Sequence, residues 1–174
     1  MRLYSQKMVL SALCVALGLI FPLLFHFFGG AGSIFLPMHI PVLLAGFLLG
    51  SRSGFLVGVL TPLLSAFLTS MPPLLPVMPI MVCELGVYGF AVGYFYHRRK
   101  LSVLKSLLAA LALGRAAAMA GAFILVSLLG LKLAPLFYVS GAIITGLPGI
   151  AIQLLLVPLL VDRLETMLKG RGKA

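Results

Sequence analysis

The chain alternates between long apolar stretches and short polar or glycine- and proline-rich ones. A helix that crosses a bilayer needs about 20 apolar residues, and fewer where protein shields its ends. The pattern therefore predicts six membrane spans. They cover about residues 8–28, 36–50, 54–69, from the end of Met71-Pro72-Pro73 to 96, 104–129 and 138–160. The sixth continues as a polar helix to about residue 168.

Glycine and proline mark the connections between the spans. A glycine-rich segment, Gly29 to Ile34, separates the first span from the second. Pro37 and Pro41 flank the start of the second span, where a missing N–H costs no hydrogen bond. Gly146, Pro148 and Gly149 predict a bend in the outer half of the sixth span.

The composition excludes a soluble protein. Hydrophobic residues make up 62% of the 174 residues, only 9% are charged, and the mean hydropathy is +1.22. Soluble domains contain roughly 45–50% apolar and about 25% charged residues. We predict an all-α integral membrane protein whose residues 1–174 form one domain, a six-transmembrane-helix bundle. Cys14 and Cys83 lie in apolar runs without metal-ligand spacing, which is typical of small core residues.

The basic residues predict the orientation of the bundle. With six spans, both termini share one side with the connections after the second and fourth spans. The basic residues on that side are Arg2, Lys7, Arg52, Arg98, Arg99, Lys100, Lys105, Arg163, Lys169, Arg171 and Lys173. The other side has only Lys132. This bias predicts cytoplasmic termini, and the net charge of +10 then indicates contact with anionic lipid rather than nucleic acid.

Two charged residues, Glu84 and Arg115, fall within predicted spans. Counting from the cytoplasmic ends at 1.5 Å per residue places them roughly 18–20 Å and 15–17 Å into the membrane. An unpaired charge at that depth is costly, so each needs a partner or a water-filled cavity. Two interpretations stay open. The residues form an ion pair that fixes the fourth and fifth spans, or they line a polar pocket that contacts a solute.

Other polar residues fall at the same outer level. Tyr88 lies four residues after Glu84 and shares its helix face. Tyr138, Ser140 and Thr145 could join them, but Ser140 and Thr145 are weaker candidates, because hydroxyls in membrane helices often bond their own backbone. The predicted substrate-binding residues are His26, His39, Glu84, Tyr88, Arg115 and Gln153. Four methionines at this level suit either packing or an aromatic ligand, namely Met38, Met71, Met78 and Met81.

Several features together resemble the substrate-binding S component of an energy-coupling factor (ECF) transporter. They are Ala12 and Ala16 spaced by four on the first span, the glycine-rich segment, the run FLPMHIPVLLAGFLLG, and LTPLLSAFLTSMPPL. The resemblance implies vitamin uptake across the bacterial plasma membrane. The S component captures the vitamin outside and docks on a transmembrane coupling protein driven by two ATPases. It also implies docking through Ala12 and Ala16, and a pocket closed by about Gly29 to Ile34.

The substrate is less closely defined. The run containing LPMHIP looks most similar to S components assigned to salvage of cobalamin precursors, such as α-ribazole or dimethylbenzimidazole. S components for pyridoxine or hydroxymethylpyrimidine are the alternative.

Two other functional classes use the same residues. Glu84 could serve a proton-coupled secondary transporter, although the two halves of the chain show no evident internal repeat. His26, His39 and Glu84 could hold a metal in an intramembrane enzyme, but no HExxH or GxSxG pattern is present. The chain also has no Walker motif, so ATP hydrolysis falls to partner subunits. We therefore predict no catalytic residues, no metal site and no cofactor.

Overall fold

The computed structural model describes residues 2–26, 32–130 and 134–171, and these residues are helical or lie in short connections. The helices are α1 (Arg2–His26), α2 (Gly32–Phe35), α3 (His39–Leu49), α4 (Ser51–Thr69), α5 (Val77–Gly93), α6 (Val103–Leu129), α7 (Pro135–Thr145) and α8 (Leu147–Arg171). A π-helical turn, η1 (Tyr94–Arg98), extends α5. The prediction of an all-α fold is confirmed.

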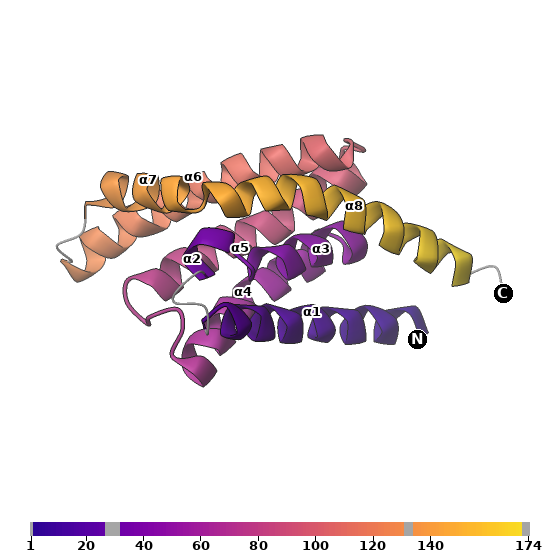
Figure 1. Ribbon diagram of the computed structural model, residues 1–174, viewed down its shortest axis with the longest axis horizontal. Helices are drawn as coiled ribbons and strands as arrows, with labels where there is room; N and C mark the ends of the chain where they lie inside the picture. The colour runs from indigo at the N-terminus through magenta and orange to yellow at the C-terminus, as the bar shows by residue number, and fades with distance from the viewer. Residues whose placement is uncertain (1, 27–31, 131–133, 172–174) are drawn as a thin grey trace.

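Six segments within the described residues are long and apolar enough to cross a membrane. They are Ser5–Phe25, Gly32–Leu49, Ser51–Thr69, Val77–Arg98, Val103–Leu129 and Leu147–Met167. The number of spans predicted from the sequence is therefore confirmed. The start of α1 and the end of α8 lie at the same end of the bundle (Figure 1), as an even number of spans requires.

The sixth span differs from its prediction. It was predicted to run as one helix over residues 138–160, but the structure ends α7 at Thr145 and starts α8 at Leu147. Gly146 closes α7 by donating its backbone N–H to the Ala142 carbonyl at 3.0 Å. Pro148 is the second residue of α8, a position where its missing N–H costs no hydrogen bond. The glycine and proline that predicted a bend therefore separate two helices.

The connection after the first span also differs from its prediction. The segment Gly29 to Ile34 was predicted as a loop, but residues 32–35 form the short helix α2. Residues 29–31 lie outside the described residues, as does Lys132, the single basic residue predicted on the outer side. The turn predicted at Met71-Pro72-Pro73 is confirmed, because it falls in the non-helical connection between α4 and α5.

Helices α4 and α5 pack closely because glycines face each other between them. A Cβ atom added to Gly54 would overlap the Gly89 carbonyl, and one added to Gly89 would overlap Gly54. Small residues at such crossings let two backbones approach within van der Waals contact. A second crossing has the same form, since a Cβ on Gly58 would overlap the Leu85 carbonyl. These contacts hold the middle and the second half of α5 in a fixed position relative to α4.

The remaining helices complete the bundle around α3 and α5. On α8, Val157 and Val161 are fully buried and pack in one cluster with Phe47 of α3 and Leu107 of α6. Helix α1 packs along α3 and α4 and leaves most of its surface exposed (Figure 1). In a membrane protein, such an exposed apolar surface faces lipid or another membrane subunit.

Candidate substrate-binding site

A cavity of about 660 Å³ lies at the end of the bundle away from the start of α1 and the end of α8. Its volume is within the usual range for small-molecule sites. It is enclosed by α2, the start of α3, the connection between α4 and α5, and parts of α1, α5, α6 and α7. Its polar or aromatic lining residues are Ser33, His39, Ser70, Glu84, Arg115, Tyr138 and Thr145.

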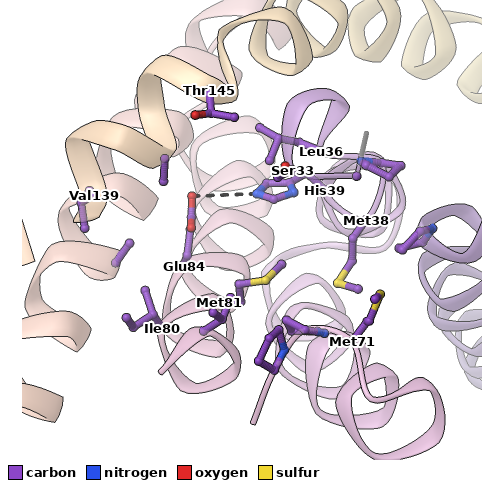
Figure 2. A pocket seen from close by; sticks show the side chains of 18 of the residues that line it. Ser33, Leu36, Met38, His39, Met71, Ile80, Met81, Glu84, Val139 and Thr145 are labelled. Carbon is purple, nitrogen blue, oxygen red and sulfur yellow. Dashed lines mark ion pairs between the residues drawn. The ribbon is translucent and has the colours of Figure 1, made fainter. Parts of the chain in front are cut away.

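Glu84 is the centre of the polar part of the cavity. Its side chain is buried, and three side chains lie near one of its carboxylate oxygens, Oε1. Tyr88 donates its hydroxyl to that oxygen at 2.9 Å, and Arg115 Nη1 lies 2.9 Å from it. His39 Nε2 lies 3.8 Å away, the pair drawn in Figure 2. The ion pair considered from the sequence is therefore present, and it neutralises a charge that would be expensive alone.

Local packing explains how these side chains meet. Glu84 and Tyr88 are four residues apart on α5, so they lie on one face of the helix. Gly114 of α6 faces the Tyr88 ring so closely that a Cβ there would overlap it. The absence of a side chain at Gly114 lets α6 approach α5, and the next residue, Arg115, then reaches the carboxylate.

The site has hydrogen-bonding capacity that the described residues do not use. His39 is the first residue of α3 and is only 2% exposed, with its ring centroid 5.4 Å from that of Tyr88. Within the described part of the chain, neither ring nitrogen of His39 has a hydrogen-bond partner, and neither do Nε and Nη2 of Arg115. Buried polar atoms are normally bonded. Unused donors around a paired carboxylate indicate a place that a polar molecule can complete.

The other candidate residues do not all line the cavity. Gln153 of α8 is fully buried, has no hydrogen bond to a described residue, and does not line the cavity. His26 is the last residue of α1, and its side chain lies outside the described part. Tyr138 and Thr145 line the cavity, whereas the Ser140 hydroxyl bonds the Phe137 carbonyl at 3.1 Å. The structure thus brings His39, Glu84, Tyr88 and Arg115 together.

The apolar wall from α7 was not recognised from the sequence. Val139 and Ala142 line the cavity together with the hydroxyl-bearing residues of α7. They were missed because residues 138–160 were treated as one continuous span. The signal that could have found them is the Gly146 and Pro148 pair, which separates α7 and so lets it form a wall of its own.

Comparison with known proteins defines the family. A family model described as "ECF transporter, substrate-specific component" matches residues 6–161, which is most of the chain. The chain belongs to this family. The comparison with curated proteins and the comparison with solved structures each found no match. The chain is thus an S component, a non-catalytic substrate-binding subunit of a membrane transporter, and a multi-pass protein of the plasma membrane.

The family also implies a small substrate and an ECF module as partner. The two alanines predicted to dock on that module lie on α1 of the S component. Ala12 is exposed and Ala16 is partly exposed. Both lie away from the cavity lining, which includes only Pro22 of the described residues of α1. A change at either alanine is therefore separated in space from the Glu84 site.

Proposed function

We propose that this S component binds a small heterocyclic vitamin or vitamin precursor in the cavity around Glu84. The observation that carries the proposal is the buried carboxylate, held by Tyr88 and Arg115 at the wall of a cavity of about 660 Å³. A fixed carboxylate beside unpartnered donors can orient a molecule that has both donor and acceptor atoms on one edge. Heterocyclic vitamins with ring nitrogens and hydroxyl groups have this property.

Glu84 is the proposed direct contact to the ligand. Tyr88 and Arg115 both reach Oε1, so we assign the second oxygen, Oε2, to a ligand hydroxyl or ring N–H. Arg115 holds the carboxylate in place from α6. His39 is positioned to bond the same ligand edge, because it lines the cavity and its Nε2 lies 3.8 Å from the Glu84 carboxylate (Figure 2).

The proposed substrate is α-ribazole or dimethylbenzimidazole, with pyridoxine or hydroxymethylpyrimidine as the alternative. A mostly apolar cavity with a single polar region suits a flat heterocycle better than a highly charged solute. Mass spectrometry of the ligand retained after mild purification tests this assignment directly. Recovery of a large cofactor, or of a compound without a heterocycle, would contradict it.

The proposed orientation places both termini in the cytoplasm and the cavity at the outer surface. The basic residues described at the termini end, Arg98, Arg99, Lys100 and Lys105, support this orientation through the positive-inside bias. In intact cells, a cysteine introduced by Lys100→Cys should resist an impermeant thiol reagent and react after lysis. The variants Cys14→Ser and Cys83→Ser provide the background. Labelling of position 100 in intact cells would reverse the orientation.

The proposed transport cycle uses a coupling protein and two ATPases as partners. The S component captures its ligand outside and docks through the strip formed by Ala12 and Ala16. Replacing both alanines by Trp should abolish uptake, because a bulky side chain prevents close helix approach. Ligand affinity of the purified variant should stay unchanged, since the strip is remote from the cavity. Uptake at the normal rate by the double variant would remove the docking assignment. A wild-type protein that does not copurify with ATPase subunits would contradict the proposed partners.

A further inference from the structure

The cavity has two chemically different sides. In Figure 2 the Glu84 carboxylate and the His39 ring lie above the sulfur atoms of three methionines. These methionines, Met38, Met71 and Met81, come from three separate places: the residue before α3, the connection between α4 and α5, and α5 itself. Met38 and Met81 also pack in one hydrophobic cluster. We name these three residues the thioether wall.

Met71 is held in place by its backbone rather than by burial of its side chain. The Ser65 hydroxyl donates to the Met71 carbonyl at 2.6 Å, and the Thr69 hydroxyl lies 3.2 Å from the same oxygen. The Met71 N–H in turn donates to the Thr69 hydroxyl at 3.3 Å. The residue remains 40% exposed although its backbone is fixed. This arrangement keeps a flexible side chain at the edge of the cavity, where packing alone does not require one.

The chemistry of the thioether separates these residues from an ordinary aliphatic wall. Leucine or isoleucine would fill the same volume with better-defined rotamers. A thioether sulfur is polarizable and gains additional attraction when it lies about 5 Å from an aromatic ring. Its three rotatable bonds also let it follow the face of a flat ligand. Such residues suit an aromatic ring better than a saturated one.

We infer that the thioether wall selects ligands by their aromatic face, while Glu84 and His39 bind the polar edge. This inference rests on the proposed function, because it assigns the chemical class of the ligand in the same cavity. The ligand class is a flat aromatic heterocycle with its hydrogen-bonding atoms along one edge. An analogue of equal size, saturated only in the ring that carries no hydrogen-bonding atoms, would keep the polar contacts and lose the contribution of the sulfur atoms.

The experiment compares two probes in calorimetric titrations of the purified, ligand-free protein. The probes are dimethylbenzimidazole and its hydrogenated analogue in which only the carbocyclic ring is saturated, so that the two imidazole nitrogens are kept. The test variant replaces Met38, Met71 and Met81 by Leu, which keeps side-chain volume and removes sulfur. We expect the variant to bind the aromatic probe about tenfold more weakly than the wild type and the hydrogenated probe equally well. The control variant Met119→Leu changes a methionine that does not line the cavity.

A second measurement covers the case in which the triple variant fails to fold. Met71→Leu alone changes an exposed side chain and should weaken binding of the aromatic probe by about twofold to threefold. In wild-type protein labelled with ¹³C at the methionine methyl groups, the aromatic probe should shift the Met38, Met71 and Met81 signals by its ring current. The Met119 signal should stay in place.

Three outcomes would overturn the inference. They are equal losses for both probes in the variants, a bound aromatic probe without methyl shifts, and a wild type that binds neither probe. The first two leave the S component with a heterocyclic ligand, so the proposed function survives them. In the third case, copurification of the wild type with ATPase subunits shows that the transport role holds and the ligand class is wrong. Absence of the ATPase subunits would contradict the transport role itself.

Discussion

Along α5 and its π-helical extension, a tyrosine contacts a carboxylate at two levels, and a histidine lies near each contact, His39 of α3 at one and His97 of η1 at the other. The two levels, called here the cavity end and the termini end, differ in how their polar atoms are bonded. At the cavity end, Tyr88 donates to Glu84, and His39 has no hydrogen-bond partner among the described residues. At the termini end, Tyr96 donates to Glu165 of α8 at 2.7 Å, and His97 Nε2 lies 2.6 Å from the Phe47 carbonyl. The residue types match, yet of these two clusters the one at the cavity end has buried polar atoms, on His39, without a hydrogen-bond partner among the described residues.

The difference indicates which polar groups in a membrane protein bind a ligand and which only hold helices together. The Tyr96–Glu165 contact joins η1 to α8, and the His97–Phe47 contact joins η1 to α3. His97 is exposed, and Tyr96 and Glu165 are partly exposed. These bonds fix helices, and none of their residues lines the cavity around Glu84. The Glu84 cluster is buried deeper, lines a cavity, and leaves polar atoms on His39 and Arg115 unbonded. Unused capacity beside a cavity, rather than polarity alone, indicates ligand binding.

The largest effect that this comparison predicts follows removal of Arg115. Arg115→Met leaves the Glu84 carboxylate buried without a cation, which typically costs about 3–5 kcal/mol of stability. The double variant Glu84→Gln with Arg115→Met should recover most of this loss, because no buried charge remains. Thermal unfolding in detergent measures both. A single variant as stable as the wild type would mean that water already solvates the carboxylate.

A smaller effect is expected from Glu84→Gln alone, and it should appear in ligand binding. The amide keeps the size of the carboxylate but replaces one acceptor with a donor. We expect binding of the retained ligand to weaken by about 1.5–3 kcal/mol, the scale of a hydrogen bond to a charged group. Calorimetry on folded, ligand-stripped protein checks this. Wild-type affinity in the variant would give the cavity end the same structural role as the termini end.

The smallest effect is predicted at the termini end. Tyr96→Phe removes the hydrogen bond to Glu165 but leaves the ring packed edge-on against Phe47. Because the bond lies near the surface, it should contribute at most about 1 kcal/mol to stability. Ligand affinity should not change. A loss of affinity comparable to that of Glu84→Gln would show that the two ends of α5 are coupled, and the contrast between them would fail.

Much of the fold follows from the sequence because the thickness of the bilayer sets the length that an apolar stretch needs in order to cross it. The six spans and the meeting of Glu84 with Arg115 both depend on that length and on the cost of an unpaired charge. The position of Gln153 depends on something else. Rotation of α8 about its axis is set by the packing of Val157 and Val161 against α3 and α6. Hydropathy contains no information on that packing, so it could not show whether Gln153 lines the cavity.

Residues of the α7 wall illustrate a second limit. Whether Gly146 and Pro148 bend a helix or divide it depends on which backbone groups find partners nearby. Here the Gly146 N–H finds the Ala142 carbonyl, and the Ile150 N–H finds the Gly146 carbonyl at 2.9 Å. Those bonds complete the end of one helix and the start of the next. The composition of the segment permits both outcomes, and the break coincides with a tertiary contact that hydropathy does not show. Gly149 lies so close to the backbone of Ile34 and Phe35 that an added Cβ atom would overlap it.

The break at Gly146 has a consequence for how a cavity of this kind can change. Because α7 is separated from the membrane-crossing α8, residues 135–145 form a short helix at the cavity wall whose sequence can change without changing α8. The glycine contacts between α4 and α5 and the ion pair of Glu84 with Arg115 contain no residue of α7. New ligand preferences can therefore arise by replacing a single short helix, while insertion into the membrane and assembly with the partner subunits stay under separate control.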